Sequence, residues 1–552
     1  MASAVAEGVL LLVPQIEPLT FSTYLYGAGS ERGGTLAVDP SGSVYIVGGT
    51  NSSDFPVTAN AFDREFSDYE GFLVKMDSRG SSLEWATYVG GVGYDYAAAV
   101  AVDARGAVYI AGRTNSTDFP TTPGAFDREL NGTDIFVAEV SSTGDQLVFS
   151  TLIGGDSNPA YEGGGQDSIA SLAVDPLGRV ILLGMTTSPN FPGADTQPPV
   201  RISDPRVFVL RLNASGSSVD YVRFLGGNGY VGEVGEGTPA LTVDASGAAY
   251  VIGTSLGEWI PATAGAFDTT SEGGFVAFVA KIDSQGGLVY TTYLGADFAY
   301  TRGMSVAVDS SGAAYVTGIA TRGFPTTPGA FQERYQGRCS SRTGECTPEV
   351  FVAKLSPDGS ALEFGTYLGP GEGRSIALSR DLRTYVSGTT ESDSFPTTFG
   401  TGVHEPRGVD IFVLTLNSEG SGVLHSRLVG GSSSDDALAV ALDPEGNAHV
   451  LGESYSDDFP TTTAGYRNRR QTSCSNLYHQ CSEGAVVVFK TGVPQGMLYS
   501  THSSLVVLFL ALPIATVLLS VFWIRRNRRR HDSGLREVRA EQSESPRRAS
   551  PP

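Results

Sequence analysis

The sequence predicts an all-β fold, a seven-bladed β-propeller of four-stranded antiparallel blades, followed by one transmembrane α-helix. The phrase A-V-D-x-x-G-x-x-Y-x-x-G recurs seven times at spacings of 64 to 72 residues. Short runs rich in β-branched and aromatic residues fill each unit, and 69 Gly accompany only 17% charged residues. A period this long suits a small sheet with one long loop better than a helical solenoid unit. A single apolar run near the C-terminus is long enough to span a membrane.

The most regular part of each unit is a D-x-x-G turn between the first two predicted strands. Its Asp can accept backbone N–H groups, and its Gly can take a positive φ. Calcium requires six to eight oxygen ligands and one turn supplies one carboxylate, so we expect these acids to be structural. They are Asp39, Asp103, Asp175, Asp244, Asp309 and Asp443, and Ser379 stands in the degenerate sixth copy.

The first strand of each unit is predicted to lie innermost in its blade. Alternate residues on one face are small in all seven copies, as at Ala99 and Ala101, whereas the other face is branched aliphatic, as at Val100 and Val102. Small side chains relieve the crowding where blades converge on the axis. In the second unit the four predicted strands are Tyr96–Asp103, Ala107–Thr114, Asp134–Val140 and Leu147–Gly155.

A long loop joins the second and third strands and carries a Phe-Pro step in most units, such as Phe119-Pro120. Proline fixes an extended bend there, and we expect the Phe to pack between blades. The outer-strand phrase occurs eight times, one more than seven blades need. Either the first copy, Phe21–Gly27, pairs near Val486–Lys490 and closes the ring, or the last copy, Leu498–Thr501, does so and the first is the relic of an upstream blade or domain.

The phrases T-Y-L-G-G, A-V-D-x-x-G-x-x-Y-x-x-G, D-F-P-T-T and D-x-F-V-A-K-L closely resemble the SBBP repeat family, whose name denotes a seven-bladed β-propeller. The resemblance covers nearly everything between Thr20 and Thr501. It is weaker in the third unit, where Ile181 replaces Tyr, and in the fourth, where Ile260-Pro261 replaces Phe-Pro. It implies a cell-surface or exported propeller and supplies no catalytic residues.

The expected domains are a propeller at residues 20–501, a juxtamembrane segment at 502–504, a transmembrane helix at 505–524 and a basic tail at 525–552. The twenty residues Leu505–Ile524 carry no charge and would span about 30 Å as a helix. Five Arg follow at once, which places the tail in the cytoplasm and the propeller outside. A buried core helix and a bacterial sorting tail are the alternatives; the polar residues after the basic cluster favour a permanent anchor.

The N-terminal segment, residues 1–19, has a short apolar stretch without a basic start. It is a poor secretory signal. It is either an atypical signal, or the true start of the protein lies upstream.

Four Cys form two C-x6-C pairs, Cys339 with Cys346 and Cys474 with Cys481. Both pairs lie in the same long loop of their units, the fifth and the seventh. We expect two local disulfides and an oxidising compartment, since a zinc site would have to join loops of two non-adjacent blades.

The net charge of −22 indicates which partners to expect. The last 28 residues hold nine Arg and four acidic residues, so the rest is even more acidic than the whole chain. Nucleic-acid binding depends on basic residues, so we expect no nucleic acid as a partner. The expected partners are the membrane and an unknown extracellular protein or glycan.

Catalytic chemistry has little support in the sequence. The chain has six His, and His449 merely replaces the repeated Tyr. The sequence contains no motif typical of a catalytic nucleophile, of phosphate binding or of metal binding. We therefore assign no catalytic, cofactor or metal residue. The sequence favours a surface protein that binds, adheres or acts as a scaffold through exposed blade loops. A polysaccharide hydrolase or lyase with its site at the channel mouth, or a structural envelope component, remain alternatives.

Overall fold

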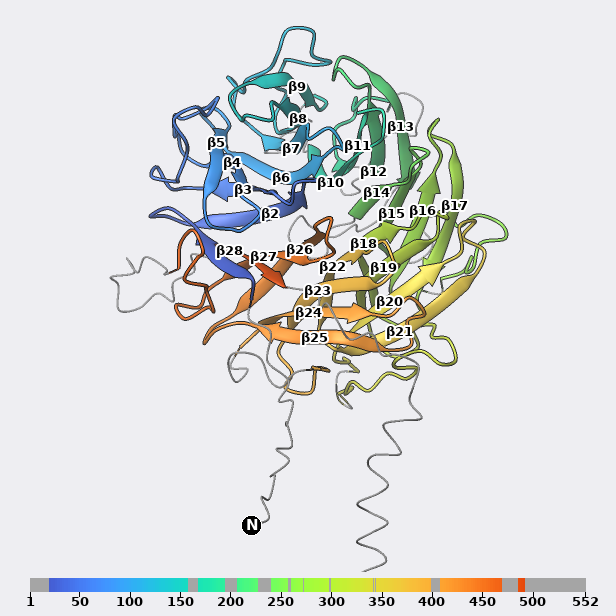
Figure 1. Cartoon of the computed structure of the whole chain (residues 1–552). Helices are drawn as coiled ribbons and strands as arrows, with labels where there is room; N and C mark the ends of the chain where they lie inside the picture. The colour runs from blue at the N-terminus through green and yellow to red at the C-terminus, as the bar shows by residue number, and fades with distance from the viewer. Residues whose placement is uncertain are drawn as a thin grey trace, which may run out of the picture. The chain divides into compact units, whose positions relative to one another are not determined.

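The computed structural model describes residues 19–156, 167–193, 206–226, 240–256, 260–271, 273–296, 299–340, 342, 344–398, 408–468 and 485–491. Its 28 strands pair into seven four-stranded antiparallel sheets (Figure 1). We number them as blades: β2–β5 form blade 1, and each following set of four strands forms the next blade, up to β22–β25 in blade 6. Blade 7 consists of β26, β27, β28 and β1. The prediction of an all-β propeller with four-stranded antiparallel blades is confirmed.

The strands of each blade follow one another from the inside outwards. The innermost strands are β2 (Glu31–Val38), β6 (Asp95–Val102), β10 (Asp167–Val174), β14 (Ala240–Val243), β18 (Thr301–Val308), β22 (Glu372–Leu378) and β26 (Asp435–Leu442). The second strands are β3 (Val44–Thr50), β7 (Val108–Thr114), β11 (Val180–Thr186), β15 (Ala249–Leu256), β19 (Ala314–Ala320), β23 (Thr384–Thr390) and β27 (Ala448–Ser454).

The outer half of each blade holds the third and fourth strands. The third strands are β4 (Glu70–Met76), β8 (Asp134–Val140), β12 (Arg206–Leu212), β16 (Phe275–Ile282), β20 (Glu349–Leu355), β24 (Asp410–Leu416) and β28 (Ala485–Thr491). The outermost strands are β5 (Leu83–Val89), β9 (Leu147–Ile153), β13 (Val219–Gly226), β17 (Leu288–Leu294), β21 (Leu362–Pro370), β25 (Val423–Val429) and β1 (Phe21–Leu25).

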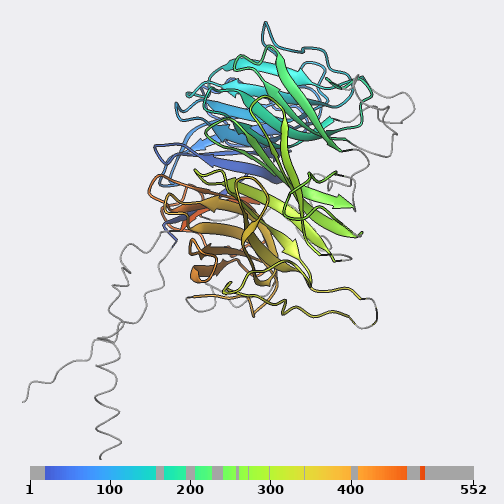
Figure 2. The same ribbon diagram turned by 90° about the vertical axis from the view of Figure 1, so that its right-hand side faces the viewer.

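The first strands form the inner ring, as their small-residue face predicts. Each contacts its counterpart in the next blade, from β2 through β6, β10, β14, β18 and β22 to β26, and β26 contacts β2. This sequence of contacts closes a circle. The turned view in Figure 2 shows the sheets of neighbouring blades packed against one another.

The N-terminal copy of the outer-strand phrase closes the ring. Strand β1 pairs with β28, with Phe21 opposite Lys490 and Tyr24 opposite Val487. The backbone N–H of Thr20 also donates to the carbonyl of Lys490 at 2.9 Å. The first of the two closure schemes is therefore the one that the fold adopts, and the last blade combines strands from both ends of the propeller.

The Phe of the long loop packs between blades, as predicted: Phe119, for example, lies in one hydrophobic cluster with Tyr45 and Val47 of blade 1. It also stacks on a Phe of the third strand of its own blade. The ring centroids are 4.3 to 4.7 Å apart in the pairs Phe55–Phe72, Phe119–Phe136, Phe191–Phe208, Phe324–Phe351 and Phe395–Phe412. The loop is thereby fixed to its blade.

Several sequence predictions fall outside the described residues. They concern the N-terminal segment up to residue 18, the span at 505–524, the tail at 525–552 and the second cysteine pair, Cys474 and Cys481. In the part of the chain that the structure describes, no helix is long and apolar enough to cross a bilayer.

Candidate functional site

A polar groove of about 820 Å³ lies between the long loop of blade 5 and the inner strands of blade 6. The blade 5 loop contributes residues 336–338 and 347–348, and the end of β21 contributes Pro370. Blade 6 contributes residues 371–372, 374, 389–392 and 394. At its inner end the groove reaches Asp436 on β26. It therefore runs from an outer loop toward the centre of the ring.

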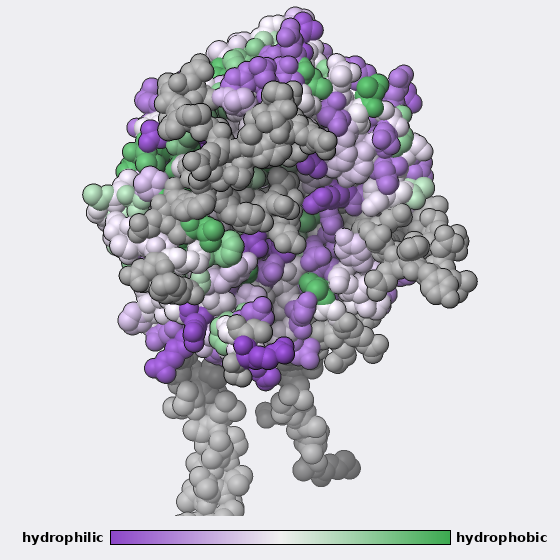
Figure 3. Space-filling view, turned by 180° about the vertical axis from the view of Figure 1, so that it is seen from behind, coloured by the Kyte–Doolittle hydropathy of each residue, from purple (hydrophilic) through white to green (hydrophobic). Residues whose placement is uncertain are grey.

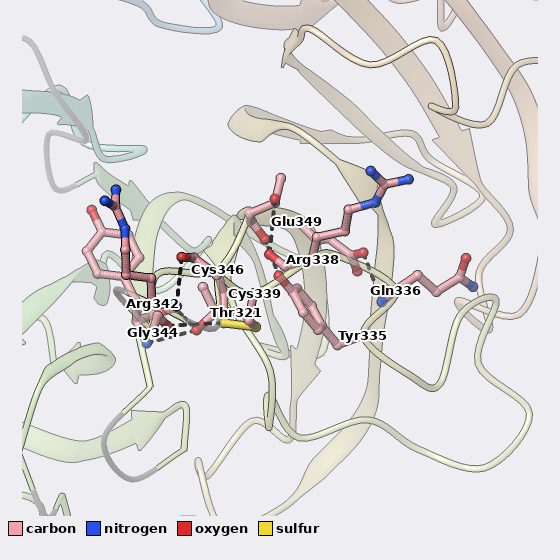
Figure 4. Close-up of a disulfide and its surroundings, with 12 residues drawn as sticks. Thr321, Tyr335, Gln336, Arg338, Cys339, Arg342, Gly344, Cys346 and Glu349 are labelled. Atoms are coloured by element: carbon pink, nitrogen blue, oxygen red, sulfur yellow. Dashed lines mark hydrogen bonds between the residues drawn. A yellow bond between two sulfur atoms is a disulfide. The ribbon is translucent and has the colours of Figure 1, made fainter.

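The blade 5 loop is held by the predicted disulfide between Cys339 and Cys346. These two residues also form an antiparallel bridge, so the loop is a small hairpin. The N–H of Thr347 donates to the carbonyl of Arg338 at 2.8 Å, and Glu349 accepts from the N–H of Gln336 at 3.0 Å. Figure 4 shows the Arg338 side chain pointing away from the disulfide. The hairpin thus fixes one wall of the groove.

Charges of both signs line the groove. Arg374 pairs with Glu372 at 2.6 Å between Nη2 and Oε2. Burial raises the pKa of Asp436, which the positive field of Arg374 partly offsets. Arg338 and Glu391 are exposed along the wall. The groove therefore offers ionic contacts and, from Thr389 to Ser394, a row of hydroxyl groups.

Charged residues that break the repeat gather at the channel mouth where the inner strands begin. Asp436 on β26 lies opposite Glu453 on β27 in the strand register. Glu453 accepts from the N–H of Gly33 on β2 at 2.9 Å. The Arg32 guanidinium lies 5.8 Å from the centre of the Tyr96 ring on β6. Blades 7, 1 and 2 thus bring two carboxyls, an arginine and a tyrosine to one mouth.

Several neighbours act on the pKa of Glu453. Burial raises its pKa, the N–H of Gly33 and the field of Arg32 lower it, and the negative field of Asp436 raises it further. Cross-strand neighbours have Cβ atoms about 4.5 to 5.5 Å apart, so the two carboxyls can act on one ligand. A pair of carboxyls in a cleft is the arrangement that acid–base chemistry on glycosidic bonds requires.

The acids of the D-x-x-G turns surround the opposite mouth. A second cavity, of about 480 Å³, brings together Asp39, Asp103 and Asp443 with Asp381 and Glu445. One carboxylate oxygen of each turn acid binds its own turn. Asp39 Oδ1, for example, accepts from the N–H of Ser41 at 2.8 Å and of Ser43 at 3.0 Å.

The second oxygen of the turn acids binds a side chain from a neighbouring strand or from the same turn. Tyr45 and Tyr250 donate to Asp39 and Asp244 at 3.2 and 3.0 Å, and Lys354 pairs with Asp309 at 3.6 Å. Asp103 and Asp175 pair with Arg105 and Arg179. These bonds occupy the carboxylates with partners inside the fold. No group of three or more metal-ligating side chains occurs among the described residues.

Sequence reasoning missed a second set of acids, at the start of the inner strands. They are buried, and each accepts from the hydroxyl of a Ser in the long loop of its own blade. The pairs are Glu31 with Ser52, Asp95 with Ser116, Asp167 with Ser188, and Asp435 with Ser456. A fixed offset of eight residues before the turn acid is the signal that would have found them.

One of the two described histidines contacts a turn acid. His449, fully buried on β27, contacts Asp443 at 3.2 Å between Nε2 and Oδ2. Burial lowers the pKa of His425, on β25, to about 4, helped by Arg427. The other four His lie outside the described ranges.

The molecular surface is mostly polar. Figure 3 shows hydrophobic residues scattered over the face seen from behind, with hydrophilic side chains gathered toward its middle. Large exposed apolar side chains stand singly, such as Val92 and Leu177. Recognition by this propeller is therefore expected to be polar.

Comparison with known proteins identifies the repeat. Residues 84–120 match the SBBP family, described as a β-propeller repeat. No curated protein matches the chain. Among solved structures, the WD40 β-propeller domain of Doa1 aligns with 86% of this chain and 97% of its own at 11% identity and a TM-score of 0.39.

Two further solved structures align over a similar length. A protein of unknown function from Dyadobacter fermentans covers 86% of this chain and 99% of its own, at 10% identity and a TM-score of 0.38. The quinohemoprotein alcohol dehydrogenase of Comamonas testosteroni covers 87% and 77%, at 9% identity and a TM-score of 0.40.

Proposed function

We propose that this SBBP-repeat β-propeller is a cell-surface protein that binds an extracellular protein or glycan through its blade loops. In this proposal one span at residues 505–524 holds the chain in the cell membrane, with the propeller outside and the tail at 525–552 in the cytoplasm. The groove beside the Cys339–Cys346 hairpin carries the binding part of the proposal, because it is the place where a rigid wall, charges and hydroxyls converge.

The size and chemistry of the groove support a polar ligand. Its volume of about 820 Å³ falls in the range of small-molecule and oligosaccharide pockets. Arg338 and Arg374 can bind carboxylate or sulfate groups, and Glu372, Glu391 and Asp436 can accept from ligand hydroxyls. The disulfide limits the conformations of the hairpin, which reduces the entropy cost of binding.

Binding is tested with the labelled full-length chain on a glycan array and on immobilised extracellular matrix proteins. Arg338→Ala removes an exposed cation from the groove, and Arg128→Ala removes one from the corresponding loop of blade 2. We expect Arg338→Ala to weaken the affinity about tenfold, since one charge-assisted contact contributes about 1.4 kcal/mol. Equal binding by Arg338→Ala and the wild type would exclude this groove.

Orientation is tested separately with a protease added to intact cells. The propeller should be cleaved, while an epitope on the tail should stay protected until the membrane is permeabilised. Cleavage of the tail in intact cells, or recovery of the chain without membrane, would contradict the membrane part of the proposal and leave the groove unaffected.

A second candidate function is a hydrolase or lyase acting on polysaccharide at the channel mouth. The pair Asp436 and Glu453, with Arg32 and Tyr96 beside it, favours this function because burial raises the pKa of both carboxyls, and a carboxyl that keeps its proton can act as a general acid. Release of new sugar ends from a panel of polysaccharides, abolished in Asp436→Asn and in Glu453→Gln, would support it. Equal release by both variants and the wild type would exclude this pair.

A further inference from the structure

Two buried carboxyls face each other at the seam between blades 1 and 2. Glu70 begins β4 and Asp95 begins β6, and their side chains approach Gly90 from two sides. A Cβ atom placed on Gly90 would lie 1.9 Å from Glu70 Oε2 and 2.7 Å from Asp95 Oδ2. The two oxygens are therefore no more than 4.6 Å apart, the sum of these distances.

The same arrangement recurs at other seams. Asp134 begins β8 and Asp167 begins β10, and they meet at the next Gly-Gly step: a Cβ on Gly154 would lie 2.1 Å from Asp134 Oδ1, and Asp167 Oδ2 accepts from the N–H of Gly155 at 3.0 Å. Between blades 6 and 7, a Cβ on Gly430 would meet Asp410 at 1.9 Å and Asp435 at 3.1 Å. The repeat thus builds carboxyl pairs at the same place in three seams, those between blades 1 and 2, 2 and 3, and 6 and 7.

Each of the first two pairs has oxygens without a hydrogen-bond partner. Glu70 Oε1 accepts from the N–H of Ser67 at 3.1 Å, and Asp134 Oδ2 from that of Asn131 at 3.2 Å. Four other oxygens are buried and unpaired: Glu70 Oε2, Asp95 Oδ1, Asp134 Oδ1 and Asp167 Oδ1. All four residues are at most 1% exposed. Ionised carboxylates in such places are costly unless something neutralises them.

The groups around the pairs do not supply a positive charge that would neutralise the carboxylates. The charged residues that act most strongly on Glu70 are Asp95, Asp63 from the preceding loop and Asp118 from the loop after β7. Those acting on Asp134 are Asp167 and Asp127.

Asp95 and Asp167 receive hydroxyl and backbone N–H groups, which are neutral. Within the described ranges no Lys, Arg or His forms an ion pair with these four carboxyls.

A proton fits these seams better than a metal ion does. Calcium takes six to eight oxygens, whereas each seam brings two carboxyls together with one Ser and one Thr hydroxyl, and no group of three or more metal-ligating side chains occurs in the described segments of the chain. A proton needs one oxygen to carry it, and removing one negative charge relieves the repulsion within the pair.

We propose that the Glu70–Asp95 and Asp134–Asp167 seams each retain a proton at neutral pH, so that the propeller packs most stably in mildly acidic surroundings and loosens as the pH rises. Burial, followed by the neighbouring acids, raises the pKa of Glu70 to about 8. Burial likewise raises the pKa of Asp134 to about 7.

The sign of the effect follows from these shifts. A carboxyl whose folded pKa lies above its unfolded value of about 4 contributes stability that is full below that value and is lost as the pH rises through the folded pKa. For Glu70 the loss extends to about pH 8, and for Asp134 to about pH 7.

The test measures the melting temperature of the full-length chain in mild detergent between about pH 6 and about pH 8.5. The double variant Glu70→Gln/Asp134→Asn carries neutral side chains of the same shape, and Asp393→Asn, an exposed site, is the matched control. We expect the wild type and the control to lose roughly 4 °C more than the double variant over this range. An equally steep loss in the double variant would overturn the proposal.

Two further measurements distinguish a retained proton from a bound cation. The infrared carbonyl band of protonated carboxylic acids should be present in the wild type at pH 7 and weaker in the double variant. If calcium raises and EDTA lowers the melting temperature of the wild type, and neither changes that of the double variant, the seams bind a cation instead. Absence of the infrared band in the wild type would likewise refute the retained protons.

Discussion

The hydroxyl of Ser375 accepts a hydrogen bond from the backbone N–H of Val440 at 3.1 Å, across the seam between β22 and β26. Three other seams carry the same bond, at 3.2 to 3.4 Å: Thr35 to Val100, Ser171 to Leu241 and Ser305 to Ile376. The small residues on this face of the inner strand therefore do more than relieve crowding between blades. Its hydroxyls satisfy N–H groups on the free edge of the next blade's inner strand, which otherwise lack a strand partner.

Removal of one of these hydroxyls tests that role. We expect Ser375→Ala to lower the free energy of unfolding by about 1 kcal/mol, because the N–H of Val440 loses its acceptor. Denaturant unfolding measures the change, and the exposed Ser53→Ala serves as a control. A loss no larger than the control's would mean that water replaces the hydroxyl.

Blade 6 carries a strained turn. Leu382 has a φ of 60°, in the position where Gly42, Gly106, Gly178, Gly247, Gly312 and Gly446 have φ values of 78° to 85°. A left-handed conformation costs a residue with a Cβ about 1 kcal/mol or more. We expect Leu382→Gly to raise the free energy of unfolding by about that amount.

The reciprocal change is Gly446→Ala in blade 7. No atom lies within 4 Å of the added Cβ, so any loss of stability comes from backbone strain and not from a clash. We expect a loss of about 1 kcal/mol in the same denaturant experiment. Opposite signs for the two variants confirm the strain, and equal signs would contradict it.

His449 replaces a tyrosine whose hydroxyl, in blades 1 and 4, binds the turn acid. Burial lowers the pKa of His449, although Asp443 opposes this, so the folded protein keeps it neutral. Its contribution to stability is present above the unfolded value of about 6.5 and is lost as the pH falls. We expect His449→Tyr to unfold like the wild type at pH 7 and to be more stable at pH 5.

The control for this prediction is His449→Phe, which keeps an aromatic ring at this position and removes the polar contact with Asp443. We expect it to lose about 1 to 2 kcal/mol at pH 7, because Asp443 is buried and loses one of its partners. Identical stabilities of the Tyr and Phe variants would show that the contact with Asp443 has no role.

We expect the Cys339–Cys346 disulfide to order its hairpin without affecting the rest of the propeller. The hairpin residues Arg338 to Ser340 are exposed and contribute no side chain to the hydrophobic core. We expect the variant with both cysteines changed to Ser to keep its melting temperature within about 2 °C. The amide of Thr347, bonded to the Arg338 carbonyl, should exchange with deuterium much faster, while the amides of β20 stay protected. Faster exchange throughout blade 5 would contradict this separation.

The sequence by itself determined the local architecture of this protein. The repeated turn, the four strand segments of each unit and the small face of the inner strand are encoded within about 70 residues, because they depend on turn chemistry and on alternation along one chain segment. In the second unit the observed strands β6 to β9 begin and end within two residues of the predicted ones.

Tertiary structure decided everything that depends on residues from different blades. The pairing of Tyr24 with Val487 closes the ring over more than 460 residues of sequence, and the sequence left two copies of the outer strand as candidates for this pairing. Glu70 meets Asp95, and Glu453 of blade 7 meets Gly33 of blade 1, only because the blades pack around a common axis. Turn and strand preferences act between near neighbours in the chain, whereas these contacts follow from the position of each sheet in the closed ring.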